Sequence, residues 1–86
     1  MKLFTFDNEK REKLLRERNI DLEVIVSMIE SWDFIDIRKV PSRENQNMFI
    51  LLYDWYICCV PFVEDNTKIF LKTAYFSRKM MKIYLK

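Results

Sequence analysis

The sequence predicts a single α+β domain in which helices pack against an antiparallel sheet. The chain has 86 residues, half of them are hydrophobic, and the helical spacing of its first third changes to strand-like runs near Trp32. A chain of this length fits one domain, which we place at residues 1–86, and folding buries only roughly 60% of the surface that the unfolded chain exposes. The protein therefore depends on close packing of its apolar residues or on a partner that covers some of them.

Two helices are expected in the first third of the chain, after a short strand or arm at residues 2–6. Asp7 is a candidate N-cap for a strongly charged helix over residues 8–18. A break at residues 19–20 follows, and Asp21 is the candidate N-cap of the next helix. That second helix has an apolar stripe at helical spacing, formed by Val24, Ile25, Met28 and Ile29. The stripe predicts that the second helix faces the core.

Four runs rich in aromatic and β-branched residues predict strands. They cover residues 32–38, 47–53, 55–60 and 68–75. The second run, NMFILLY, is almost entirely apolar, so we expect burial on both of its faces. Because the links between the runs are short, the strands are expected to form a three- to four-stranded antiparallel meander. Ser77 is a candidate N-cap for a final helix over residues 78–85.

Several classes of enzyme are excluded by residue types that the chain lacks. It has no glycine, which excludes the glycine-rich loops that cradle phosphates and dinucleotides. It has no histidine, which excludes histidine-based triads and a two-histidine ribonuclease mechanism. Cys58 and Cys59 are adjacent and lack zinc-site spacing, so we expect buried, reduced thiols, no metal and no cofactor. The N-terminus lacks the apolar core of a signal peptide and no run is apolar enough to span a membrane, so a cytoplasmic protein is expected.

The positive charge is concentrated toward the C-terminal end. Residues 64–86 hold six basic and two acidic side chains, a net +4 in a chain whose total is +2. Lys68 and Lys72 share one face of the expected strand. The expected final helix carries a line of cations at intervals of four residues, formed by Arg78, Lys82 and Lys86. Cations interleaved with aromatic rings suit a phosphate chain and its bases, although a lysine-rich terminal helix is also typical of a solvated face.

Two segments at opposite ends of the chain share motifs with one known family. The first is the run Phe4–Lys10 (FTFDNEK) with the break Arg18-Asn19-Ile20, and the second is Phe76-Ser77-Arg78-Lys79 with Tyr84. In these motifs and in its element order the chain resembles the BrnT-type toxins, members of the RelE-like group of small ribonuclease toxins. The chain differs from that family at Glu17-Arg18-Asn19, where Lys-His-Gly is common, and at Met80-Met81-Lys82, where a glutamate is common.

The resemblance implies a RelE-like fold and the toxin component of a toxin–antitoxin pair that cleaves mRNA. It implies two partners, an RNA substrate and a cognate small antitoxin that carries a DNA-binding domain. Operator DNA is then contacted only through the toxin–antitoxin complex, and no membrane contact is expected.

Metal-independent cleavage by the RNA 2′-hydroxyl needs a base, an acid and cations around the phosphate. Arg78 is the candidate phosphate ligand, because its planar guanidinium can bond two phosphate oxygens. Lys72 or Lys82 is the candidate base or assisting cation, and Tyr84 is a candidate to bind a nucleobase or donate a proton. Further RNA contacts are expected from Lys68, Ser77, Lys79, Arg43 and Lys86. The alternatives are a helix cap for Ser77, core packing for Tyr84 and a solvated loop position for Arg43.

Two other functions fit the same sequence. The first is a non-catalytic binding or adaptor module, because half of so short a chain is apolar and a partner surface is a natural reason for that. The second is a nucleic-acid-binding regulator without cleavage, whose binding depends steeply on salt while the RNA stays intact. Growth arrest with loss of RNA on expression distinguishes the toxin from both.

Overall fold

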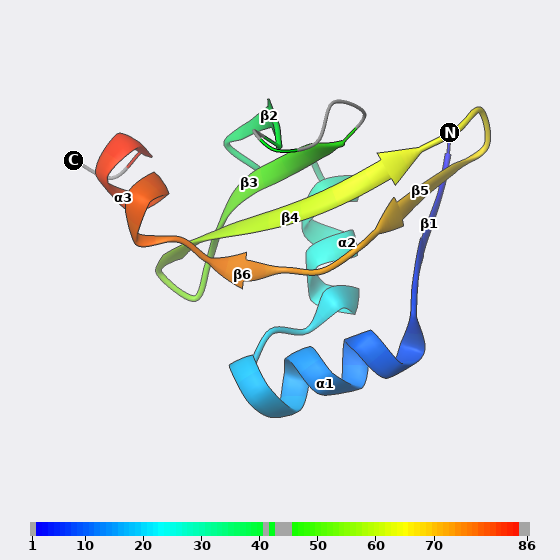
Figure 1. Cartoon of the computed structure of the whole chain (residues 1–86), viewed down its shortest axis with the longest axis horizontal. Coiled ribbons are helices and arrows are strands. Elements are labelled where there is room, and N and C mark those ends of the chain that lie inside the picture. The colour runs from blue at the N-terminus through cyan, green and yellow to red at the C-terminus, as the bar shows by residue number, and fades with distance from the viewer. Residues whose placement is uncertain (1, 41, 43–45, 85–86) are drawn as a thin grey trace.

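The computed structural model describes residues 2–40, 42 and 46–84, so the predicted RNA contacts Arg43 and Lys86 lie outside the described residues. Helices and strands mix as expected for the α+β class (Figure 1). In chain order the elements are β1 (Leu3–Phe6), α1 (Asn8–Arg18), α2 (Leu22–Glu30), β2 (Asp36–Lys39), β3 (Asn47–Tyr53), β4 (Tyr56–Glu64), β5 (Lys68–Leu71), β6 (Tyr75–Phe76) and α3 (Arg78–Tyr84).

The sheet is larger than predicted and is not wholly antiparallel. Its six strands are ordered β1-β5-β4-β3-β2, and β6 pairs with the opposite end of β4 from β5. β2 to β5 form the expected meander, whereas β1 lies parallel to β5, with Leu3 opposite Lys68. The prediction of three or four antiparallel strands is therefore wrong in strand number and in one pairing. A parallel pair needs a long connection, and most of the chain separates β1 from β5.

Two strands also differ from the predicted bounds. β2 begins at Asp36 rather than at residue 32, because Trp32 takes a left-handed backbone (φ 60°) directly after α2 and turns the chain. β4 continues through Pro61 to Glu64 instead of ending there. Pro61 has no N–H to donate to a neighbouring strand, but its carbonyl accepts the Lys72 N–H at 2.8 Å.

The predicted strand over residues 68–75 is interrupted by a bulge between β5 and β6. Leu71 pairs with Phe62 and Tyr75 pairs with Cys59, so the segment from β5 to β6 has one more residue than the part of β4 that it faces. The extra residue reverses the alternation of side chains. Ala74 is consequently buried among the α1 and α2 contacts rather than lying beside the exposed Lys68. The single strand predicted over residues 68–75 therefore does not present one continuous face, because Ala74 turns to the helical core.

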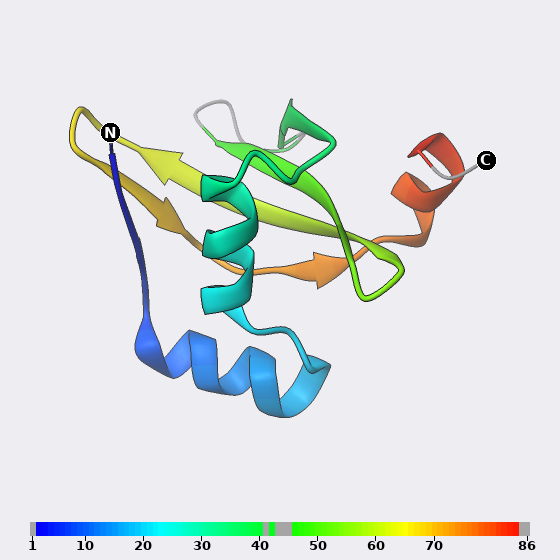
Figure 2. The same cartoon turned by 180° about the vertical axis from the view of Figure 1, so that it is seen from behind.

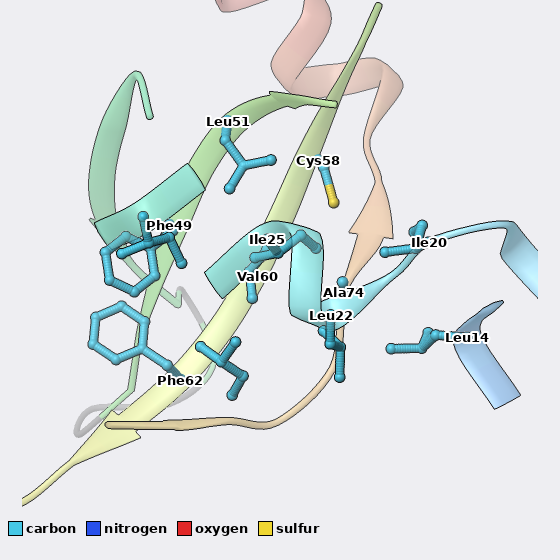
Figure 3. Close-up of a cluster of buried hydrophobic side chains, with 12 residues drawn as sticks. Leu14, Ile20, Leu22, Ile25, Phe49, Leu51, Cys58, Val60, Phe62 and Ala74 are labelled. Atoms are coloured by element: carbon cyan, nitrogen blue, oxygen red, sulfur yellow. The ribbon is translucent and has the colours of Figure 1, made fainter. Parts of the chain in front are cut away.

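The two faces of the sheet are covered differently. The first, called here the helical face, is crossed by α2, which lies behind the sheet in Figure 1 and in front of it in Figure 2. Its core, shown in Figure 3, includes Leu14, Ile20, Leu22, Ile25, Phe49, Leu51, Cys58, Val60, Phe62 and Ala74. The second, called here the open face, buries a smaller cluster against α3, formed by Met48, Ile50, Ile57 and Cys59. β3 contributes to both clusters, which confirms the prediction for the run NMFILLY.

The predicted caps of the first two helices are confirmed. The Asp7 carboxylate accepts the Glu9 N–H at 2.8 Å, and the Asp21 carboxylate accepts the Glu23 N–H at 2.9 Å. Each cap satisfies an N–H that has no partner within its helix. The Asp21 N–H donates to the Tyr53 hydroxyl at 3.0 Å, which fixes the start of α2 to the end of β3.

Candidate nucleic-acid interface

An open pocket of about 550 Å³ lies where β6 leads into α3. The end of α1, the turn between β3 and β4, β6 and the start of α3 all meet there. We call it the two-arginine pocket, and it is lined by Arg18, Asn19, Asp54, Tyr56, Phe76, Ser77, Arg78 and Met81. Two cationic side chains and one carboxylate leave this lining with a net positive charge, and most of the remaining surface is aromatic or apolar.

Arg18 enters the pocket from the last turn of α1. Asn19 follows it with a left-handed backbone (φ 57°), which ends the helix. The Arg18 guanidinium donates from Nη1 to the Ala74 carbonyl oxygen at 2.9 Å, so the bulge between β5 and β6 holds the side chain in place. A guanidinium has five N–H donors, which leaves others for a ligand. The sequence alone does not single out Arg18, because the mixed charges of residues 8–18 are typical of a solvated helix.

Arg78 enters the same pocket from the first position of α3 and is exposed. Among the described residues, one ion pair lies within 4.0 Å, and it joins Lys2 to Glu64. Neither pocket arginine is therefore paired with a carboxylate of the described part of the chain. The neighbouring Ser77 accepts the Met80 N–H through Oγ at 3.2 Å, as expected for a helix cap, and it lines the pocket as well.

Aromatic side chains form a wall of the pocket. The ring centroids of Tyr56 and Phe76 lie 5.7 Å apart, and the centroid of the Tyr53 ring lies 6.3 Å from that of Phe76. Tyr56 and Phe76 remain 52% and 39% exposed, so part of each ring is open to a ligand. Cations beside exposed rings are a combination that suits single-stranded nucleic acid.

The predicted lysines do not join this pocket. Lys68 opens β5, at the end of the sheet away from α3 (Figure 1). Lys72 lies in the bulge and is half-buried, while Lys79 and Lys82 are exposed on α3 without lining the pocket. The structure thus brings Ser77 and Arg78 together and places Lys68 far from them.

Tyr84 lies on the open face, where it connects α3 to β2. Its hydroxyl donates to Asp36 Oδ2 at 2.7 Å, a bond that lowers the pKa of Asp36 and raises the pKa of Tyr84. Arg38 reaches the same helix from β2, with Nη1 3.5 Å from the Met80 sulfur. Tyr84 is thus bonded away from the two-arginine pocket, which its position six residues beyond Arg78 on a helix explains.

The two cysteines are free and buried, as expected. Burial is the main cause that raises the pKa of both thiols, to about 12 for Cys58. Side chains point to opposite faces of β4, so Cys58 belongs to the core under α2 and Cys59 to the cluster under α3. Neither thiol reaches the two-arginine pocket lining.

Comparisons of the chain with known protein families, with curated proteins and with solved structures gave no match. Within the described residues, no helix has the length and apolar character needed to cross a membrane. In the same part of the chain, no group of three or more His, Cys, Asp or Glu side chains is placed to hold a metal ion.

Proposed function

We propose that the chain is a metal-independent endoribonuclease that cleaves mRNA, and the toxin component of a toxin–antitoxin pair with a RelE-like fold. The observation that carries the proposal is the two-arginine pocket. Arg18 and Arg78 converge there beside exposed aromatic rings, and no described carboxylate neutralises either guanidinium. Arg78 also belongs to the C-terminal motif that resembles the BrnT-type toxins.

In the proposed reaction the RNA 2′-hydroxyl attacks the adjacent phosphorus. The hydroxyl proton passes to a base, the bond to the 5′-oxygen breaks, and that oxygen takes up a proton. The products are a 2′,3′-cyclic phosphate and a free 5′-hydroxyl. Arg78 and Arg18 bind the phosphate oxygens, whose negative charge grows in the transition state.

The base is assigned by its position relative to the pocket. Asp54 is the carboxylate that lines the pocket, and we propose it as the base in place of Lys72, which lies in the bulge outside it. Lys82 lies one helical turn beyond Arg78 and also outside the pocket lining, so we propose it only as a nearby cation that attracts the phosphate chain. Tyr84 keeps its hydroxyl on Asp36 on the open face, so a role in catalysis requires that bond to open.

RNA cleavage in the presence of a metal chelator tests the proposal. The wild-type chain is expected to cut an unstructured transcript and leave 2′,3′-cyclic ends. Arg78→Ala should slow cleavage about a hundredfold or more, because the loss of one transition-state hydrogen bond often costs about 2.7–4 kcal/mol. Arg16→Ala is the matched control, since Arg16 is an exposed arginine of α1 outside the pocket. Cleavage by Arg78→Ala at the wild-type rate, or no cleavage by the wild type, contradicts the proposal.

The proposed partner is a cognate small DNA-binding antitoxin in the cytoplasm, through which the complex contacts operator DNA. An apolar groove of about 320 Å³ on the helical face is the surface that we expect it to cover. Its lining includes Phe4, Phe34, Phe49 and Ile69, and the rim carries Trp32, which is 82% exposed. Trp32→Ser should weaken the complex with the neighbour-encoded protein and leave RNA cleavage by the free chain unchanged.

The same groove favours the second candidate function, a non-catalytic adaptor. Ile37 of β2 also lines the groove and is 47% exposed, and Ile35, just before β2, is 45% exposed. An adaptor would bind its partner through this surface without arresting growth or depleting RNA when it is expressed alone. Growth arrest that depends on Arg78 rules the adaptor out.

A further inference from the structure

The turn between β3 and β4 holds a tryptophan in an unfavourable backbone conformation. Tyr53 pairs with Tyr56, so Asp54 and Trp55 form a two-residue turn, with φ angles of 53° and 71°. Turns of this kind favour Asn-Gly or Asp-Gly, because glycine adopts positive φ without steric cost. A bulky residue held in this region costs of the order of 1–3 kcal/mol. Asp54 is tolerated at its position, and Trp55 is the costly one.

Burial of the indole ring does not offset that cost. Trp55 is 82% exposed, and no aromatic ring of the described residues packs against it. Its neighbour Tyr56, by contrast, packs against Phe76. The folded state therefore gains little from the ring of Trp55, which points to a ligand as the reason for a tryptophan at this position.

Asp54 before Trp55 and Tyr56 after it both line the two-arginine pocket, so the backbone of Trp55 adjoins the pocket lining. We propose that Trp55 is a stacking platform for an unpaired nucleobase of single-stranded RNA whose phosphate lies between Arg18 and Arg78. This inference rests on RNA binding in the proposed function and not on cleavage. Stacking of one base on an aromatic side chain contributes about 1–3 kcal/mol.

The surroundings of Trp55 favour single-stranded RNA over a duplex or a protein. In a duplex the bases are already stacked on one another, so they are not free to cover a tryptophan. Trp32 is equally exposed and also has a positive φ, but its ring stacks on Phe34 at 5.9 Å and its groove is lined by apolar side chains with one lysine and one glutamate. The two residues that flank Trp55 instead line a pocket that contains two arginines, which favours a polyanion.

Tryptophan fluorescence tests the inference directly. In a Trp32→Phe background Trp55 is the sole tryptophan, and a short 2′-O-methyl oligonucleotide has no nucleophilic hydroxyl and stays intact. We expect binding of the unpaired oligonucleotide to quench the fluorescence, and a duplex of the same sequence to bind more weakly. Trp55→Ala should weaken binding about tenfold, within the range given by 1–3 kcal/mol. Trp32→Ala is the matched control and should bind as the wild type does.

Trp55→Gly separates a ligand role from a structural one. Glycine suits the positive φ, so this variant should unfold at a higher urea concentration than the wild type while it binds the oligonucleotide about tenfold less tightly. Binding without quenching, or an affinity of Trp55→Gly equal to that of the wild type, refutes stacking and leaves RNA binding in place. The inference is also overturned if Trp55→Gly is less stable than the wild type, or if it weakens the binding of a protein partner but not of the oligonucleotide. No oligonucleotide binding by the wild type refutes both this inference and the proposed function.

Discussion

Removal of the two pocket arginines, singly and together, should change the salt dependence of RNA binding by a calculable amount. Arg18 and Arg78 line one pocket from helices at opposite ends of the chain, and neither has a carboxylate partner among the described residues. A phosphate held there replaces condensed counterions, which are released to the solvent. The logarithm of the affinity then falls linearly with the logarithm of the salt concentration.

The magnitude follows from one phosphate contact for each arginine. Each contact to a single strand contributes about 0.7 to the slope, which is about a 2.6-fold loss of affinity when salt rises fourfold. Each single alanine variant should therefore lower the slope by about 0.7. At low salt it should also lose about tenfold or more in affinity, because hydrogen bonds to charged groups contribute about 1.5–3 kcal/mol. The double variant should lose less affinity than the two single losses combined, since residues that share a ligand are coupled.

Fluorescence anisotropy with a labelled 2′-O-methyl oligonucleotide gives both the slope and the affinity. The salt concentration is varied from about 50 to about 200 mM, the range over which phosphate contacts are most visible. Arg16→Ala removes the same charge from the same turn of α1 without touching the pocket. Its slope should stay close to that of the wild type. If Arg16→Ala and Arg18→Ala change the slope equally, the protein binds RNA through its general charge and the pocket has no special role.

Three further predictions concern stability. The Asp65 carboxylate accepts the backbone N–H groups of Thr67 and Lys68, which lowers its pKa below 3.8. The contribution of Asp65 to stability is therefore present above pH 3.8 and is lost as the pH falls below it. Urea unfolding of Asp65→Asn should depend less on pH in this acidic range than unfolding of the wild type. Cys58 is buried and its pKa is raised to about 12. Iodoacetamide at about pH 8, close to the pKa of an ordinary thiol, should therefore label Cys58 only as fast as the chain opens. Rapid labelling of the folded protein would contradict the packing of Cys58 under α2. Ile25→Ala should lower the free energy of unfolding by about 2–5 kcal/mol, because Ile25 is fully buried between α2 and the sheet. Urea denaturation measures this loss, and a loss below about 1 kcal/mol would mean that α2 does not cover this face.

The sequence predicts the helical half of the fold well because the signals there are local. Asp7 and Asp21 act on N–H groups two residues away, and the stripe of α2 lies within two turns, where Ile25 and Ile29 are buried as predicted and Val24 is exposed. The sheet depends on pairings over long stretches of chain, which local patterns do not encode. Nothing within Leu3–Phe6 indicates that this run pairs with β5, more than sixty residues later in the chain. The insertion of one residue after Leu71 is equally invisible, because the run KIFLKTAYF contains no glycine or proline to mark a break in a strand.

That bulge explains both why the predicted strand has no continuous face and how Arg18 is held in the pocket. It ends the alternation that would have aligned Lys68 and Lys72 with residue 74, and it presents the Ala74 carbonyl to the Arg18 guanidinium. Counting charge along the chain finds Arg78, because its basic neighbours are close in sequence. The same count does not single out Arg18, because its helix mixes five basic with three acidic side chains and its position in the pocket depends on a carbonyl 56 residues away. A site assembled by a break in strand register is therefore seen only when the register itself is known.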